Sequence, residues 1–162
     1  MTSPQPLRHL YLGGARSGKS KLAETTAQAW LRQHPQGRVV YIATAQIRDQ
    51  EMQTRVDLHQ QRRPASWQLL EQPLLLADTL DQLQTESDQP TCVLVDCLTL
   101  WLTNHLCQEV TEDVDVVSLT EQAIDELVVQ VERYTEQLLL VSNEVGSGIV
   151  PMGELSRQFQ DL

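Results

Sequence analysis

A complete phosphate-binding loop constrains this chain more than any other feature of its sequence. Residues 13–20 read Gly13-Gly14-Ala15-Arg16-Ser17-Gly18-Lys19-Ser20, which is the pattern G-x-x-x-x-G-K-S. The apolar run at 9–12 precedes the loop and a helix-like stretch follows it, which gives the order of strand, loop and helix that such a loop needs. Backbone N–H groups of this turn and the helix N-terminus favour phosphate. We therefore predict a nucleoside triphosphate ligand, with Lys19 reaching its terminal phosphates and Ser20 holding Mg²⁺.

The charge balance excludes several classes of partner. The chain has 22 Asp and Glu against 12 Lys and Arg, and its two lysines, Lys19 and Lys21, both lie at the phosphate loop. Such an acidic chain lacks the basic face that nucleic-acid binding or an anionic membrane surface requires. No apolar stretch has the length of a membrane span, and residues 1–6 do not resemble a signal peptide. We expect a cytoplasmic protein with no nucleic-acid partner and no membrane insertion.

Length and cysteine content indicate one ordinary domain. A chain of 162 residues with 41% hydrophobic residues can bury a proper core. Cys92, Cys97 and Cys107 have neither C-x-x-C spacing nor the even number of a disulfide framework. We expect these cysteines to be reduced and structural.

Short apolar runs alternate with longer amphipathic segments along the chain. The expected strands are Leu10–Leu12, Val39–Ile42, Cys92–Val95 and Leu138–Val141, with a weaker edge strand at Trp67–Leu70. The expected helices are 19–33, 50–62, 73–84, 97–107 and 116–134. Strands that are apolar on both faces are typical of a parallel sheet covered by helices on both sides. We predict an α/β fold, a three-layer P-loop NTPase-like sandwich with a mostly parallel central sheet.

Asp96 is the first candidate for a second part of the phosphate site. It directly follows the buried run Cys92–Val95. An acidic residue at that position commonly holds Mg²⁺, directly or through water, in phosphate-transfer proteins. By itself the pattern is that of an ordinary strand end, but together with an intact phosphate loop we favour the metal site.

His59 is a candidate nucleophile with an open alternative. Arg55, His59 and Arg63 have the spacing i, i+4 and i+8, so they share one face if the helix persists. Two guanidiniums there would pair with phosphates and depress the pKa of the imidazole, which would keep it neutral and nucleophilic. The same spacing also fits a solvated helix face with an incidental histidine, and spacing alone favours that interpretation.

Two further groups of polar residues follow expected strands. Thr44 and Gln46 come after the strand at 39–42, and Asn143 and Glu144 come after the strand at 138–141. In a parallel sheet both groups open on the same edge as the phosphate loop, so Thr44 and Gln46 can face ligand. Asn143 and Glu144 belong either to a glycine-containing turn or to the ligand site.

Five segments, spread over nearly the whole chain, resemble one family. They are the phosphate loop, Tyr41-Ile42-Ala43-Thr44-Ala45, the stretch 49–64 with Glu51-Met52, Arg55, His59 and Arg63-Pro64, Val95-Asp96-Cys97-Leu98-Thr99-Leu100-Trp101-Leu102-Thr103-Asn104, and Ser142-Asn143-Glu144-Val145-Gly146 followed by Gly148-Ile149-Val150-Pro151. The family that they resemble is the bifunctional adenosylcobinamide kinase/adenosylcobinamide-phosphate guanylyltransferase of cobalamin biosynthesis. The phosphate loop alone is generic, whereas the His59 segment and the segment at 143–151 together are highly specific.

The resemblance implies two reactions. Members of this family phosphorylate adenosylcobinamide with a nucleoside triphosphate, ATP or GTP, and then transfer GMP from GTP to the new phosphate through a guanylylated histidine. The residue at the matching position here is His59. Mg²⁺ is the implied cofactor, adenosylcobinamide is the implied substrate, and a homo-oligomer is the implied assembly. The residues implied at the guanine nucleotide are Thr44, Ala45, Gln46, Gln60, Gln61, Arg62, Arg63, Glu71 and Asp96.

The C-terminal end departs from the family pattern. The chain stops at Leu162, inside an expected helix opened by Pro151, whereas the family normally continues to a further strand. We therefore expect one P-loop nucleotide-binding domain over 1–162 that lacks the usual C-terminal segment of the family. The loss of a strand would expose a sheet edge.

Two other functions are compatible with the phosphate loop. The first is a different small-molecule kinase in which His59 is only structural, and the second is an inactive, truncated relative that binds GTP. Intact Lys19, Ser20, Asp96 and His59 argue against a decayed site. Covalent trapping of GMP on the protein discriminates between these alternatives, since a simple kinase would trap none.

Overall fold

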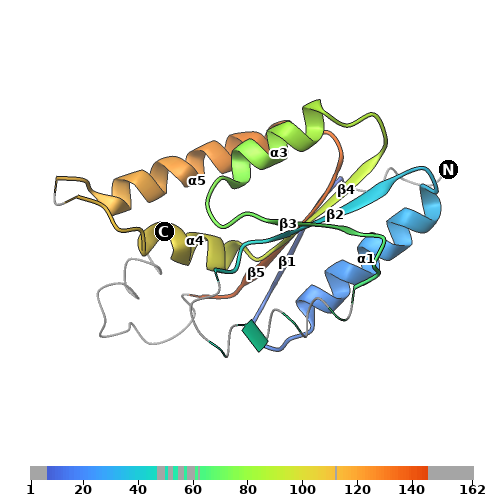
Figure 1. Ribbon diagram of the computed structural model, residues 1–162, viewed down its shortest axis with the longest axis horizontal. Helices are drawn as coiled ribbons and strands as arrows, with labels where there is room; N and C mark the ends of the chain where they lie inside the picture. Colours follow the sequence, from blue (N-terminus) through green and yellow to red (C-terminus); the bar gives the residue numbers. More distant parts are fainter. Residues whose placement is uncertain are drawn as a thin grey trace.

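Five parallel strands form one central sheet in the order β1-β5-β4-β2-β3 (Figure 1). The computed structural model describes residues 7–46, 50, 53–54, 57, 61, 63–111 and 113–145. The strands are β1 (Arg8–Gly13), β2 (Arg38–Ala43), β3 (Gln68–Glu71), β4 (Thr91–Asp96) and β5 (Gln137–Asn143). The helices are α1 (Lys19–Gln33), α3 (Leu76–Thr85), α4 (Leu98–Leu106) and α5 (Val116–Arg133). None of the helices in this part of the chain is long and apolar enough to cross a membrane.

The helices cover the sheet on both faces, which gives three layers. Helix α1 lies on one face, and α3, α4 and α5 lie on the other (Figure 1). Alternate residues of each central strand supply the two cores, as the period of two in a strand requires. On the α1 face, Tyr41 and Leu94 pack with Ala23 and Ala27 of the helix. On the opposite face, Ile42 packs in the larger cluster with residues of α3 and α5.

Local residues explain where the helices begin. Helix α1 follows Gly18, which has a left-handed φ of 85° that glycine adopts at little cost. Helix α5 follows Asp115, whose carboxylate accepts hydrogen bonds from the Val117 N–H and the Ser118 hydroxyl. These bonds lower the pKa of Asp115, because they favour its charged form.

The predicted strands, including the edge strand, are all confirmed, and so is the α/β class. The sheet is parallel throughout its five strands. The predicted helix at 19–33 matches α1, and those at 97–107 and 116–134 match α4 and α5 to within one residue at each end. The helix predicted at about 73–84 matches α3, which begins three residues later, at Leu76. The reason is the Gln72 side chain, whose Oε1 accepts from the N–H groups of Leu74 and Leu75 before the helix starts.

Two predictions concern parts of the chain that are only partly described. Most of the helix predicted at 50–62 lies outside the described residues, although Gln50, Gln53, Thr54, Asp57 and Gln61 are helical. The segment 146–162 also lies outside the described residues. A single domain over 1–162 therefore stays a prediction.

Candidate nucleotide-binding site

The phosphate loop connects the end of β1 to the start of α1. Arg16 and Gly18 both have left-handed backbone conformations, with φ values of 59° and 85°. Such residues turn successive N–H groups toward one concave surface, where an anion can bind. A Cβ at Gly13 would lie 2.8 Å from Ser17 Oγ, so the Ser17 side chain would have to move to accept any other residue there. The backbone of the loop therefore has a shape that suits a bound phosphate.

Lys19 and the first turn of α1 supply the positive side of the loop. The Lys19 ammonium donates to the Gly14 carbonyl oxygen at 2.9 Å, so its charge lies over the loop. The residue before the helix, Gly18, provides no side-chain cap, and the first turn contains no acidic residue. The N–H groups at the start of α1 therefore lack an anionic side-chain partner in the described chain and can bind a phosphate oxygen.

The parallel sheet brings the other candidate residues to the same edge. In the strand register, Gly13 of β1 lies beside Asn143 of β5, and Ala43 of β2 lies between Asp96 of β4 and Glu71 of β3. The Glu144 N–H donates to the Gly13 carbonyl oxygen at 3.0 Å. Strand β5 separates β1 from β4, so Gly13 and Asp96 lie two strand spacings apart across the sheet, roughly 10 Å. They are also offset by two residues along the strands, because Gly13 pairs with Asn143 and Asp96 with Val141.

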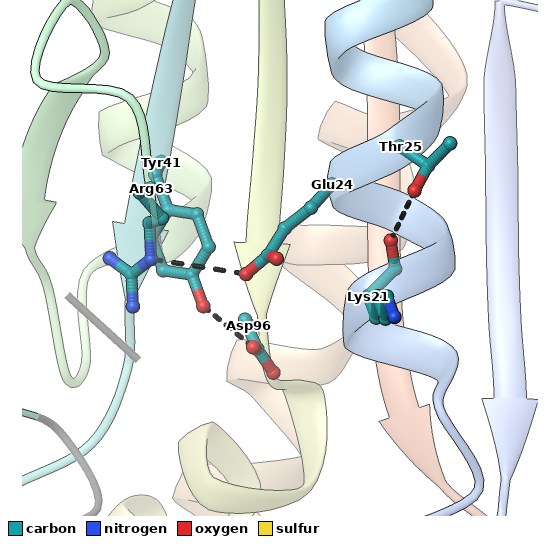
Figure 2. Close-up of polar contacts among 6 residues, drawn as sticks. All are labelled: Lys21, Glu24, Thr25, Tyr41, Arg63 and Asp96. Carbon is teal, nitrogen blue, oxygen red and sulfur yellow. Dashed lines mark hydrogen bonds and ion pairs between the residues drawn. The ribbon is translucent and has the colours of Figure 1, made fainter. Parts of the chain in front are cut away.

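Asp96 belongs to a cluster of four polar side chains, together with Tyr41, Arg63 and Glu24 (Figure 2). The Tyr41 hydroxyl donates to Asp96 Oδ2 at 2.6 Å. The Arg63 guanidinium carbon lies 3.4 Å from the centre of the Tyr41 ring, and Arg63 Nε lies 4.0 Å from Glu24 Oε1 of α1. The Arg63 side chain is 8% exposed. This cluster connects α1, β2, β4 and the segment that follows residue 61.

Tyr41 acts as a hydrogen-bond donor in this cluster. Burial raises the pKa of the Tyr41 phenol strongly, and the negative charge of Asp96 raises it further, while Arg63 lowers it. The phenol therefore keeps its proton at any physiological pH. Asp96 Oδ2 is the acceptor of this hydrogen bond.

Buried hydrogen bonds fix the ends of β2 and β4. Thr44 Oγ1 donates to the Cys97 carbonyl oxygen at 2.7 Å and accepts from the Cys97 N–H at 2.9 Å. Asn104 Nδ2 donates to the carbonyl oxygens of Thr44 and Pro73, at 2.7 Å and 3.0 Å. One buried amide of α4 thus holds the segment after β2 and the segment after β3 in fixed positions.

The structure brings most of the described candidate residues to one edge of the sheet. The phosphate loop, Thr44, Ala45, Gln46, Glu71 and Asp96 lie there, and Arg63 lies against Tyr41. Thr44 is fully buried and its hydroxyl bonds within the protein, so it braces the site instead of facing solvent. Gln61 is exposed. His59, Gln60 and Arg62 lie outside the described residues, and their contacts with nucleotide stay predictions, as do those of the other candidates.

The sequence reasoning missed four residues of this edge, namely Tyr41, Glu24, Asn104 and Thr99. Thr99 Oγ1 accepts from the Asn143 N–H at 2.7 Å. Strand alternation could have found Tyr41, since it falls on the same face of the sheet as Asp96 once β2 and β4 are paired in register. The other three depend on how helices pack on the sheet, and no local pattern indicates that.

Comparison with known proteins identifies the family. Residues 9–162 match the family described as cobinamide kinase / cobinamide phosphate guanyltransferase. The chain belongs to this family. It is 47% identical over 156 residues to the bifunctional adenosylcobalamin biosynthesis protein CobP of Pseudomonas aeruginosa, a match that covers 96% of this chain and 82% of that protein. It is 40% identical to the bifunctional adenosylcobalamin biosynthesis protein CobU of Salmonella typhimurium, over 94% of this chain and 83% of that protein.

A solved structure confirms the fold class. The chain is similar, with a TM-score of 0.52, to a DnaB-like replicative helicase structure. The match covers 92% of this chain and 42% of the helicase chain, at 11% sequence identity. At this identity the likeness concerns the fold alone. It agrees with the three-layer P-loop NTPase-like sandwich predicted from the strand and helix pattern of this sequence.

Proposed function

We propose that this chain phosphorylates adenosylcobinamide with a nucleoside triphosphate and then transfers GMP from GTP to adenosylcobinamide phosphate. The products of the second step are adenosyl-GDP-cobinamide and pyrophosphate. The observation that carries the proposal is an intact phosphate loop, with the Lys19 ammonium over it, at the same sheet edge as Asp96. The family match over residues 9–162 supplies the substrate class.

In the first step, the chain's own groups bind and orient the triphosphate. The N–H groups of the loop and of the first turn of α1 bind phosphate oxygens. Lys19 exchanges its contact with the Gly14 carbonyl oxygen for the terminal phosphates. The aminopropanol hydroxyl oxygen of the substrate then bonds to the γ-phosphorus while the bond to the bridging oxygen breaks, so that the nucleoside diphosphate leaves and the hydroxyl proton passes to solvent. Positioning and charge stabilisation account for most of the catalysis in this type of reaction.

Ser20 and Asp96 are the residues that would hold Mg²⁺. Both offer oxygen ligands, the type that Mg²⁺ prefers, and one or two protein ligands are usual where phosphates and water complete the coordination. The bond from the Tyr41 hydroxyl keeps Asp96 an acceptor, which fits a cation. When bound, Mg²⁺ neutralises charge on the phosphates of the nucleotide.

In the second step, His59 carries the GMP group. The neutral imidazole forms a bond to the α-phosphorus of GTP while the bond to pyrophosphate breaks. The phosphate of adenosylcobinamide phosphate then attacks the same phosphorus, and the imidazole leaves. The family resemblance of the segment at 49–64 supports this role. A Mg²⁺ requirement, the cytoplasmic location and a homo-oligomeric assembly also stay predictions.

The test is transfer of the α-phosphate label of GTP to the protein. The wild-type chain and His59→Ala are incubated with Mg²⁺ and GTP labelled at the α-phosphate, and acid-labile, base-stable label is counted. His34→Ala is the matched control, since His34 stacks on Trp30 at the far end of α1. We expect label on the wild type and on His34→Ala, and none on His59→Ala. Label that survives in His59→Ala contradicts the assignment of His59.

A parallel assay separates the two reactions. Transfer of the γ-phosphate label of ATP or GTP to adenosylcobinamide measures the kinase step alone. Because the first step does not use His59, His59→Ala should keep it. A folded wild type that phosphorylates adenosylcobinamide but takes up no GMP would show that only the kinase half is correct.

A further inference from the structure

Tyr41 occupies the junction between the two parts of the proposed site. Its hydroxyl contacts Asp96, and its ring contacts Arg63 (Figure 2). Tyr41 itself is 3% exposed and lies too deep in the α1 face of the sheet to touch substrate. It therefore influences the chemistry only through its neighbours, and the two neighbours that belong to the proposed site are Asp96 and Arg63.

We propose that Tyr41 is a positioning residue with two separate functions. Its hydroxyl orients the Asp96 carboxylate for both reactions, and its ring seats Arg63 and thereby the chain segment that carries His59. The inference rests on the proposed function, in which Asp96 holds Mg²⁺ and His59 accepts GMP.

The hydroxyl function follows from the geometry at Asp96. The terminal torsion of an aspartate is broad, so a carboxylate at a strand end does not by itself keep one orientation. A phenol that donates at 2.6 Å fixes one oxygen, Oδ2, and thus sets the direction of the other. Groups that hold a metal-binding carboxylate in this way commonly change metal affinity about 10- to 100-fold when they are removed.

The ring function follows from the position of Arg63. Its guanidinium carbon lies 3.4 Å from the centre of the Tyr41 ring, Glu24 Oε1 lies 4.0 Å from its Nε, and the side chain is buried. A cation over an aromatic face is attracted by the ring, most strongly where water is excluded. Arg63 follows His59 by four positions, so the His59 Cα cannot lie farther than about 14 Å from the anchored Arg63 Cα. The anchor at Arg63 therefore limits how far the preceding segment can extend from this side chain.

The other tyrosines of the chain show what a purely structural tyrosine does. The Tyr11 hydroxyl donates to Thr26 Oγ1 at 2.7 Å, between β1 and α1. The Tyr134 hydroxyl has no hydrogen-bond partner among the described residues. Tyr11 is thus a matched control, because it pairs a strand hydroxyl with α1 without contacting the residues around Asp96.

The first experiment measures metal binding directly. Mn²⁺, as a spectroscopic substitute for Mg²⁺, is titrated into the protein that is saturated with a non-hydrolysable GTP analogue, and binding is followed by electron paramagnetic resonance. We expect Tyr41→Phe to bind Mn²⁺ about 10- to 100-fold more weakly than the wild type, and Tyr11→Phe to bind it as the wild type does. Both half-reactions of Tyr41→Phe should recover as Mg²⁺ is raised. Wild-type Mn²⁺ affinity in Tyr41→Phe would overturn the hydroxyl function.

The second experiment tests the ring. Tyr41→Met removes the hydroxyl and the ring, whereas Tyr41→Phe keeps the ring beneath Arg63. The kinase rate should be equally low in both variants, but GMP transfer to His59 should be lower in Tyr41→Met by a further factor of about 10. Equal GMP transfer in the two variants would overturn the ring function.

Failure of the proposed function gives a different result. A wild type that takes up no GMP contradicts the role of His59, yet the Mn²⁺ titration still decides whether Tyr41 positions Asp96. Urea unfolding of each variant separates lost positioning from lost structure.

Discussion

Thr44→Val tests the buried connection between the ends of β2 and β4. The two side chains have nearly the same shape, but valine lacks the hydroxyl that bonds to both backbone groups of Cys97. Thr44 is fully buried and Cys97 is 6% exposed, so water cannot replace the missing hydroxyl without local opening of the structure.

The expected loss of stability follows from the hydrogen bonds that the backbone carbonyl oxygen and N–H of Cys97 keep in the variant. The Cys97 carbonyl oxygen also accepts from the Trp101 N–H at 3.2 Å, so it loses one of two bonds, which costs about 1 kcal/mol. The Cys97 N–H loses its acceptor, and an unsatisfied buried donor costs about 1–3 kcal/mol. We expect the free energy of unfolding to fall by about 2–4 kcal/mol.

The assay is equilibrium urea unfolding, with Thr120→Val as the control. Thr120 is also fully buried, but its hydroxyl donates to the Val116 carbonyl oxygen in its own helix, which the helix ladder still satisfies. Its loss should cost about 0.5–1 kcal/mol. With a slope near 2 kcal/mol per M urea, the midpoint should fall by about 1–2 M for Thr44→Val and by less than about 0.5 M for Thr120→Val. Equal midpoints for the two variants would refute the reasoning.

Two further predictions concern titratable groups outside the proposed site. Burial lowers the pKa of His105, so between that pKa and the unfolded value of 6.5 the unfolded chain binds more protons. The free energy of unfolding should therefore fall as the pH is lowered from 7.5 through 6.5, and His105→Gln should weaken this dependence. Urea titrations of both proteins at pH 7.5 and 5.5 measure it. The same change in unfolding free energy in the wild type and in His105→Gln would contradict the prediction. Burial raises the pKa of the Cys92 thiol to about 12 and also raises that of Cys97, whereas Cys107 is half-buried. With Ellman's reagent at pH 8, one thiol of the folded protein should react quickly, and all three should react in urea. Cys107→Ser should abolish the fast phase. Rapid reaction of the two remaining thiols in the folded variant would contradict the prediction and show that the core opens.

Local chemistry explains why so much of the fold could be predicted from the sequence. The pattern G-x-x-x-x-G-K-S is tied to one local structure, a phosphate-binding loop between a strand and a helix. Each central strand is a short apolar run between turn residues. The start of helix α1 could be predicted to the residue, because Gly18 and the loop determine where the helix begins. The family match confirms the resemblance that these segments show.

Features that depend on packing could not be predicted. In the sheet, β5 lies between β1 and β4, although β1 is far from both in the sequence. The order of the strands depends on how the helices pack on the two faces, which no local pattern indicates. The start of α3 shifted because of a Gln72 side chain that no helix pattern includes. The bond from the Thr44 hydroxyl to Cys97 is likewise not indicated by the position of Thr44 after a strand, and the contact of Thr44 with ligand stays a prediction. In each case a contact between distant segments decides the outcome.

The strand order also affects how the protein is synthesised. Among the described strands, β1 pairs with β5 alone, and Gln137 at the start of β5 follows Gly13 by 124 residues. At ribosomal rates of about 5–20 residues per second, the phosphate loop leaves the ribosome about 6–25 s before the strand that will support it. During that interval β1 and its leucines have no partner strand in the nascent chain. Nucleotide can therefore stabilise the fold only late in synthesis, after β5 has emerged and closed the sheet.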